Sequence, residues 1–294
     1  MLTLFLEPLT HNFMVQGLAV SSLLGVLCAV VGTYLIVQQM AMMGNMISHA
    51  VLPGLSLAFF FNIDLAIGAF IAGALSALSV AAIHSQSRIK PDSAIALVLS
   101  GFLALGIILI KVLQTNRLNL DAILFGDILG VTPTDLWRTL GLTLLVLLCV
   151  KLFYKELLFY TFDPLGAQAC GLPVTWLYLG LIAAMTLSIT ASMQTVGVLL
   201  VVSLLIAPSS TGYLLAKELH WVMGLGAIAS ILASLIGLYL SYYWALPTGP
   251  TIVLINILIF LAAFLFSPSQ GILTQPETWH RANVLLRKIE QKFK

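Results

Sequence analysis

Charged side chains are scarce in this chain: they make up 8% of its 294 residues, whereas hydrophobic residues make up 60%. Soluble domains contain about 25% charged and about 45–50% apolar residues, so a soluble helical bundle does not fit this composition. Apolar runs of roughly 20 residues, each able to cross a hydrocarbon core about 30 Å thick, recur along the chain. We therefore expect an all-α, polytopic membrane protein that lies in a lipid bilayer and has no nucleic acid partner.

Basic residues are missing from the N-terminal part of the chain, and cysteines are few. No Lys or Arg precedes Arg88. Cleavable signal peptides begin with a positively charged region, so we expect none here. Cys28, Cys149 and Cys170 form no CxxC pair and no metal-ligand spacing, and their odd number argues against a disulfide framework. We interpret them as small apolar fillers.

Three motifs that would indicate catalysis or nucleotide binding are missing from the sequence. There is no G-x-x-x-x-G-K-[ST] phosphate loop, so the chain does not bind ATP in the usual backbone cradle. There is also no G-x-S-x-G elbow and no H-E-x-x-H motif. We therefore expect no catalytic residues, and any energy source must be another chain or an ion gradient.

Nine apolar segments are present, and together they predict one membrane domain over residues 1–294, without internal repeats. The segment at 46–61 is short and contains Pro53-Gly54, which is typical of a broken membrane helix. The predicted segments are 13–37, 46–61, 64–84, 94–113, 136–160, 174–193, 196–216, 222–243 and 251–267.

The basic residues predict the orientation of the chain in the membrane. Five of them follow the last apolar run, so the tail at about 269–294 should be cytoplasmic. The last part of this tail is typical of a basic amphipathic helix that lies on the membrane surface. The stretch 151–173 and the loop with Arg88 and Lys90 then also lie inside. With nine crossings the N-terminus lies on the far side, and with eight it is cytoplasmic; the sequence leaves both open.

The stretch MMGNMISHAVLPG, residues 42–54, contains the first candidate site. On a helix, Met42, Asn45, Met46 and His49 recur every three or four residues and share one face. Imidazole is a good ligand for first-row divalent metals, and the Asn carbonyl oxygen is a weak, hard ligand. A histidine that is hydrogen-bonded to a neighbouring helix is an equally acceptable interpretation.

Two carboxylates form the second candidate. Asp121 and Asp127 fall in a short apolar stretch, although the whole chain has only 11 acidic residues. They could supply oxygen ligands along a cation path. Alternatively, Asp121 caps a short helix and Asp127 lies in a solvated loop on the far side.

The third candidate is Phe162–Pro173, which the basic residues place on the cytoplasmic side. Asp163-Pro164 is a helix start, with Asp as N-cap and Pro in the first turn, while Gly171 and Pro173 end the helix after about two turns. This short helix is either a surface connection between two spans or a lever that docks on a partner.

Together these stretches resemble the permeases of ABC-type manganese, zinc and iron importers. That family usually carries a G-D-[AST]-[ILM]-[SA]-H-A motif, which reads GNMISHA here, at Gly44–Ala50. Its L-F-G-[DN]-[IL]-L-[AG]-V and F-D-P…G-L-P segments also have counterparts. The further segments that carry the resemblance, in the family's order, are Leu124–Val131, Phe162–Pro173, Thr195–Pro208, Leu246–Val253 and Leu265–Pro268.

The resemblance implies a type II ABC importer-like fold with about eight to nine transmembrane helices per subunit, one broken helix and a short cytoplasmic coupling helix. It implies a second permease subunit, identical or related, two cytoplasmic ATP-binding subunits and an extracytoplasmic metal-binding protein, in the cytoplasmic (inner) membrane of a prokaryote. This chain would bind no cofactor; it would pass a divalent metal cation, with ATP bound by the partner subunit.

The resemblance also assigns roles to residues. The coupling helix at about 163–173 would sit in a groove of the ATPase. Its contact residues would be Phe162, Asp163, Pro164, Gly171, Leu172 and Pro173. His49 would contact the metal, with Asp121 and Asp127 in or near the same path and Asn45 as a secondary contact.

Two departures from the family pattern reduce the negative charge that faces a cation. The family's Asp in G-D-x-x-x-H is Asn45 here, and its Asp before the L-F-G segment is Asn119. Asp121 could compensate, although on a helix it faces another way. A partner permease with the full acidic set, a differently selected ion, or lost transport would each be compatible with these changes. We expect transport to be retained, because the coupling segment and the far-side loop match the family.

The leading hypothesis is therefore the permease subunit of an ATP-driven importer of Mn, Zn or Fe. Mn²⁺ suits oxygen-rich sites and Zn²⁺ and Fe²⁺ accept imidazole, so ligand chemistry alone does not choose between them. One alternative is a secondary cation carrier with Asp121 or Asp127 as its proton site. The other is a non-conducting permease paralogue that assembles with an active one.

Overall fold

The computed structural model describes residues 7–113, 126 and 128–267, and every regular element in these ranges is a helix. Two are short 3-10 helices, η1 (Pro8–Thr10) and η2 (Ile128–Gly130). The α-helices are α2 (Asn12–Val37), α3 (Ala41–Ala50), α4 (Leu52–Phe60), α5 (Leu65–Gln86), α6 (Pro91–Val112), α8 (Pro133–Leu152), α9 (Tyr154–Phe162), α10 (Pro164–Ala169), α11 (Val174–Val196), α12 (Val198–Leu215), α13 (Leu219–Trp244) and α14 (Thr248–Phe266).

Eight stretches of the described chain are long and apolar enough to cross a membrane, which confirms the all-α polytopic fold. They match eight of the nine predicted segments. The ninth, 136–160, comprises two helices, because the chain divides at Phe153 into α8 and α9, and α8 is not among the eight stretches. Lys151, Lys155 and Glu156 surround this division. Charged side chains are costly in hydrocarbon, so the apolar segment ends here and α9 lies outside it.

The predicted broken helix is present. Helix α3 ends at Ala50 and α4 begins at Leu52, so the break falls at Val51. Pro53 lies in the first turn of α4, where its missing N–H removes no hydrogen bond from the helix. The span begins at Ala41, earlier than the predicted start at residue 46.

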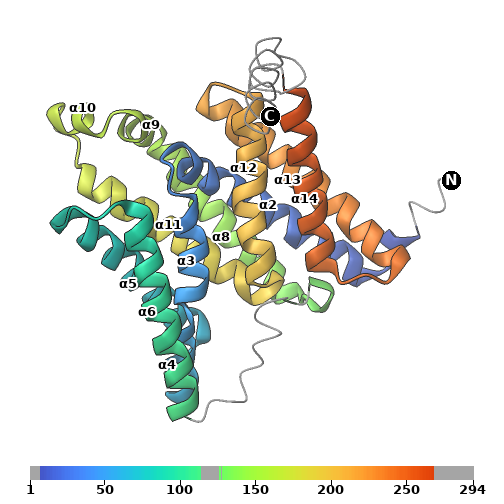
Figure 1. The fold of residues 1–294 in the computed structure, drawn as a ribbon. Helices are drawn as coiled ribbons and strands as arrows, with labels where there is room; N and C mark the ends of the chain where they lie inside the picture. The colour runs from blue at the N-terminus through green and yellow to red at the C-terminus, as the bar shows by residue number, and fades with distance from the viewer. Residues whose placement is uncertain (1–6, 114–125, 127, 268–294) are drawn as a thin grey trace, which may run out of the picture.

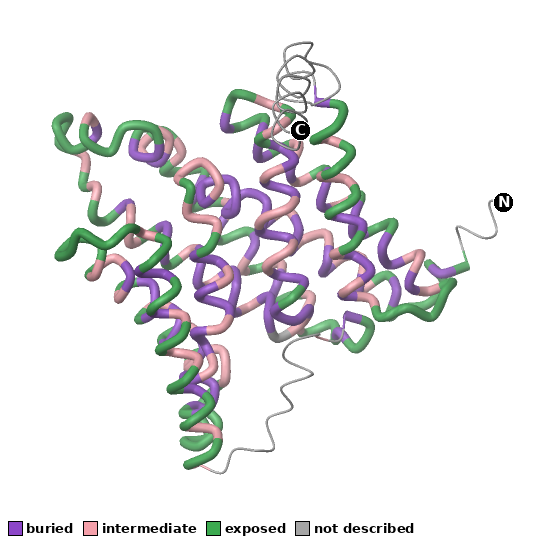
Figure 2. Tube along the Cα trace, viewed as in Figure 1, coloured by how far each residue is buried: buried purple, intermediate pink, exposed green. Residues whose placement is uncertain are grey.

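The helices pack in two groups (Figure 1). Helices α2, α12, α13 and α14 pack together on one side, and α4, α5 and α6 pack together on the other. Helix α3 lies between them and contacts α5, α6, α11 and α12. Buried residues concentrate where these helices meet, while exposed residues follow the outer faces (Figure 2). The two groups therefore hold α3, which carries the first candidate site, in a central position.

Glycine contacts bring α4 and α5 together closely. A Cβ atom at Gly54 would collide with the carbonyl oxygen of Gly68, and a Cβ atom at Gly68 would collide with that of Gly54. Membrane helices often associate through such small residues, because lipid tails provide no hydrophobic force between helices. The second half of the broken span is thus fixed against α5.

The two ends of the helix array differ in what they contain. One end, called here the α10 end, carries α9, α10, the link between α2 and α3, and the turn between α5 and α6. Residues of all four line one cavity, to which α10 contributes only its first residue, Pro164. At the opposite end, the backbone of Gly126 lies directly against Val196 and Gly197, where α11 meets α12.

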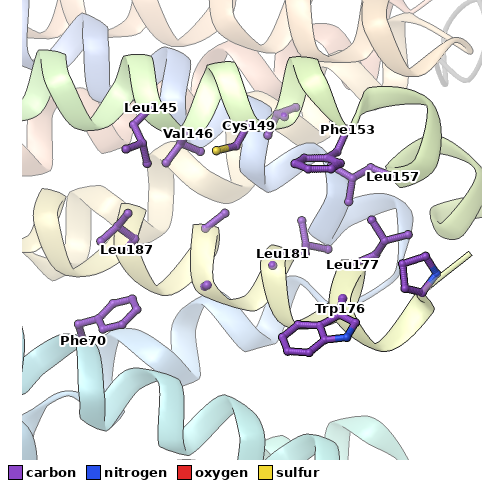
Figure 3. A pocket seen from close by; sticks show the side chains of 15 residues that line it. Phe70, Leu145, Val146, Cys149, Phe153, Leu157, Trp176, Leu177, Leu181 and Leu187 are labelled. Carbon is purple, nitrogen blue, oxygen red and sulfur yellow. The ribbon is translucent and has the colours of Figure 1, made fainter.

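The described chain runs between these two ends of the helix array nine times. Helix α8 runs antiparallel to α11, with Leu145 beside Leu187 and Phe153 beside Leu177 (Figure 3). It therefore adds a ninth traversal to the eight apolar stretches. Helix α14 ends beside the end of α12, where the Ser267 hydroxyl donates a hydrogen bond to the Leu214 carbonyl. Within the described residues, α2 accordingly begins at the opposite end and α14 finishes at the α10 end.

Candidate functional site

Helix α3 carries the four residues that the sequence placed on one face. All of them lie within Ala41–Ala50, so the helical spacing is confirmed. Their burial separates them: Met46 is fully buried and Met42 is 60% exposed, while Asn45 and His49 are half-buried. Met46 belongs to the core. The remaining three, Met42, Asn45 and His49, form a strip on the surface of the protomer, called here the α3 strip.

The α3 strip reaches the middle of the membrane span. His49 lies eight residues after Ala41 in a span that ends at Phe60. At 1.5 Å per residue, His49 is about 12 Å along a helix about 30 Å long. His49 therefore lies near the middle of this candidate span, one residue before the end of α3.

Packing on its other faces fixes the direction in which α3 presents this strip. Gly44 lies against Leu205 of α12, where a Cβ atom would be 3.4 Å from the leucine side chain. Ile47 lies against Gly73 of α5, where a Cβ atom would be 3.2 Å from the isoleucine side chain. Rotation of α3 would break both contacts, so the strip stays at the surface.

Neither Asn45 nor His49 uses its side chain to bond a described residue. No hydrogen bond joins either side chain to another part of residues 7–113, 126 or 128–267. The interpretation of His49 as bonded to a neighbouring helix therefore finds no support in this part of the chain. Polar groups facing hydrocarbon without partners are unfavourable, so a half-exposed imidazole at mid-depth needs water or another subunit beside it.

The second predicted constellation cannot be placed. Asp121, Asp127 and Asn119 lie outside the described residues, as does the basic tail 269–294. Among the described residues, no group of three or more His, Cys, Asp or Glu side chains is close enough to hold a metal ion. Within this part of the chain, His49 is thus not one member of a closed metal cage.

A groove between α5, α8, α9 and α11 is unsuited to a cation. It encloses about 400 Å³, and its lining includes Phe70, Cys149 and Trp176 but no carboxylate, histidine or amide side chain (Figure 3). Divalent transition metals need oxygen, nitrogen or thiolate ligands in number. One thiol does not provide them, so this groove is an apolar surface feature.

The predicted short helix at Phe162–Pro173 is present at the α10 end. The Asp163 carboxylate accepts a hydrogen bond of 2.8 Å from the backbone N–H of Gly166, and Pro164 occupies the first turn of α10. Gly171 has φ +81°, a left-handed conformation that favours glycine, and it follows the last turn. Pro173 then precedes α11. The predicted start and stop residues are confirmed.

Two apolar side chains are exposed here, Phe162 at the end of α9 and Leu165 in the first turn of α10. Leu165 is 80% exposed and Phe162 is 62% exposed, although both lie at the α10 end and not along the apolar flank of the bundle. The sequence reasoning included Phe162 but missed Leu165. The signal was available, because a leucine in the first turn of a six-residue helix has few neighbours to cover it.

Comparison with known proteins decides the family. A family model described as the ABC 3 transport family matches residues 10–267. The chain belongs to the ABC 3 transport family. Among relatives, it is 42% identical over 275 residues to a manganese transport system membrane protein, MntC, of Halalkalibacterium halodurans, covering 93% of this chain and 94% of that one. It is 37% identical over 265 residues to a chelated iron transport system membrane protein, YfeD, of Yersinia pestis, covering 90% and 89%.

Two solved structures share the fold of this member of the ABC 3 transport family. The chain is similar to PsaBC from Streptococcus pneumoniae in complex with Fab, with a TM-score of 0.82 and 39% identity, covering 92% of this chain and 98% of that one. A putative metal-chelate type ABC transporter in an inward-facing conformation is similar in fold, with a TM-score of 0.63 and 17% identity over 85% of each chain.

Proposed function

We propose that this chain is the permease subunit of an ATP-driven importer that moves a divalent transition metal, Mn²⁺, Zn²⁺ or Fe²⁺, across a cytoplasmic membrane. Membership of the ABC 3 transport family supports the class of protein. The observation that carries the mechanism is the α3 strip, because it places Asn45 and His49 at the surface of the protomer and at mid-depth.

The metal path lies between this protomer and a second permease subunit. A second subunit against the α3 strip gives Asn45 and His49 the polar surroundings that a lone protomer lacks. Asp121 and Asp127 contribute carboxylates to the same path. One imidazole, an amide and a few carboxylates hold an ion transiently, whereas four tetrahedral ligands would trap it.

The energy comes from a separate ATP-binding subunit on the cytoplasmic side, which binds the α10 end. The exposed Phe162 and Leu165 supply the apolar contact, and Asp163, Pro164, Gly171, Leu172 and Pro173 fix the shape of the segment. An extracytoplasmic metal-binding protein delivers the ion at the opposite end. ATP-driven closure of the ATPase pair pushes α10 and opens the path inward. No chemical step takes place on this chain.

Reconstitution in proteoliposomes tests this proposal. The chain is assembled with its ATP-binding subunit and metal-binding protein, and uptake of radioactive Mn²⁺ is measured with and without ATP. We expect uptake to require ATP and to stop when the phosphate-loop lysine of the ATPase is replaced by alanine. Uptake by this chain alone, driven by a proton gradient without ATP, would identify it as a secondary carrier and overturn the proposal.

A further inference from the structure

We propose that Gln38 and Thr161 are positioning residues that join the α10 end to the α3 strip, so that movement of α10 is passed to Asn45 and His49. The Nε2 atom of Gln38 donates a hydrogen bond to the Thr161 hydroxyl oxygen at 3.4 Å. This contact joins two segments that are 123 residues apart in the chain. The inference rests on the proposed function, because it assumes that α10 receives the ATPase.

On one side of this hydrogen bond, the chain leads directly into α3. Gln38 follows the last residue of α2, and Gln39 adopts a left-handed conformation with φ +59°. The Met40 N–H then donates a hydrogen bond of 2.8 Å to the Leu35 carbonyl, which closes the turn, and α3 begins at Ala41. Because the link is this short and internally bonded, a displacement of Gln38 displaces the start of α3.

On the other side, the chain leads directly into α10. Thr161 and its neighbour Tyr160 are buried in the last turn of α9, while the adjacent Phe162 is 62% exposed. Tyr160 also belongs to the hydrophobic core, so this end of α9 is held by packing. Asp163 caps α10 two residues after Thr161. Helix α10 therefore has no flexible spacer between itself and Thr161.

The surroundings of the contact leave room for movement. A cavity of about 550 Å³ opens between these segments and the turn from α5 to α6, and Gln38, Thr161 and Pro164 all line it together with His84 and Lys90. Close-packed interiors resist displacement, whereas unfilled space permits it. A shift of α9 and α10 thus meets little packing from the α5 to α6 turn, while the hydrogen bond to Gln38 transmits it to α3.

The test compares variants that remove the hydrogen bond at nearly constant side-chain size with matched controls that keep it. Thr161→Val removes the hydroxyl at constant shape, and Thr161→Ser restores it. Gln38→Met removes the amide donor, and Gln39→Met is the matched control because Gln39 is exposed and has no such contact among the described residues. Proteoliposomes containing the complete assembly are assayed for Mn²⁺ imported per ATP hydrolysed, and the melting temperature of each complex is recorded.

We expect Thr161→Val and Gln38→Met each to lower the Mn²⁺ to ATP ratio at least fivefold while ATP hydrolysis continues. Thr161→Ser and Gln39→Met should stay within twofold of wild type. The double variant should be no worse than either single variant, as expected for two residues that act through one contact. If Thr161→Val fails to assemble, Gln38→Met alone decides the result.

Two outcomes contradict the inference. One is a wild-type ratio in Gln38→Met, and the other is a double variant whose loss equals the product of the two single losses. Both differ from failure of the proposed function itself, since in that case the wild-type assembly would show no ATP-driven uptake at all.

Discussion

At the scale of single residues, the α3 strip holds two polar side chains of the proposed metal path. Asn45 and His49 are half-buried polar side chains in a helix whose other faces are packed, and neither bonds to a described residue. Their neighbour Met42 is more exposed but offers a thioether, which favours softer ions than Mn²⁺. Variants of these three residues therefore separate a metal path from a packing feature.

Replacement of His49 by alanine should lower the initial rate of Mn²⁺ uptake at least tenfold, because the imidazole is the strongest ligand of the strip. Met42→Ala should change the rate by less than twofold and serves as the control on the same face. Uptake in reconstituted vesicles measures both. If His49→Ala transports like wild type, the metal does not pass along this strip.

Asn45→Asp should lower the KM for Mn²⁺ by about tenfold, equivalent to about 1.4 kcal/mol. The substitution adds a carboxylate one turn from His49, and opposite charge stabilises a bound cation. Asn45→Gln keeps the amide and should leave the KM within threefold of wild type. An unchanged KM in the Asp variant would mean that Asn45 does not face the ion.

Only part of this site could be predicted from the sequence. The spacing of Asn45 and His49 established a shared face, because helical periodicity is a local property. It did not reveal that Met46 turns into the core, since that depends on α12 and α5 packing around α3. The roles of Asp121 and Asp127 stay predictions, because both residues lie outside the described ranges.

At the scale of helices, α10 shows how a short element is specified locally. It has six residues and begins with a side-chain cap from Asp163. Helices this short are marginal in isolation, so their end residues decide whether they form. Capping and proline are readable from sequence, which is why the start and stop of α10 were predicted correctly.

Asp163→Ala should weaken α10 by about 1 kcal/mol through loss of its N-cap. We expect the Mn²⁺ to ATP ratio to fall, together with binding of the ATPase measured by co-purification. Asp163→Asn retains a capping oxygen and should behave like wild type. Equal loss in the Ala and Asn variants would show that the carboxylate charge, and not the cap, is required.

Gly54→Ala should destabilise the protein by about 1–3 kcal/mol, since the added methyl group collides with the backbone of α5. Gly101→Ala is the matched control in α6, where a Cβ atom meets nothing within 4 Å. Thermal unfolding in detergent should show a lower midpoint for Gly54→Ala and an unchanged or higher one for Gly101→Ala. Equal midpoints would refute close packing of α4 on α5.

At the scale of the whole molecule, nine traversals place the two ends of the described chain on opposite sides. The sequence left eight and nine crossings open, because the segment 46–61 is short and interrupted by Pro53-Gly54, and only Asn62, Ile63 and Asp64 separate it from the next run. In the structure Ala41–Phe60 and Leu65–Gln86 are separate traversals, and α8, which ends at Leu152, adds one that the eight apolar stretches do not include. The number of traversals thus depends on how a broken helix and its neighbour are divided, and local hydropathy does not determine that.

Labelling with a membrane-impermeant maleimide tests this orientation. Cys170 is exposed at the α10 end and should react only in inside-out vesicles. In a Cys170→Ser background, Leu246→Cys places a thiol at the opposite end and should react in intact cells. Labelling of Cys170 from outside intact cells would reverse the orientation and with it the docking side of the ATPase.

The exposure of the α3 strip has a consequence for biogenesis. A newly inserted copy without a second subunit presents the His49 imidazole and the Asn45 amide to lipid acyl chains. This unfavourable contact ends only when another surface covers the α3 strip. If a second permease subunit covers this surface, as proposed, the bilayer favours pairing after synthesis. Orphan copies left by unequal expression would be recognisable to membrane proteases through the same surface that is proposed to line the ion path.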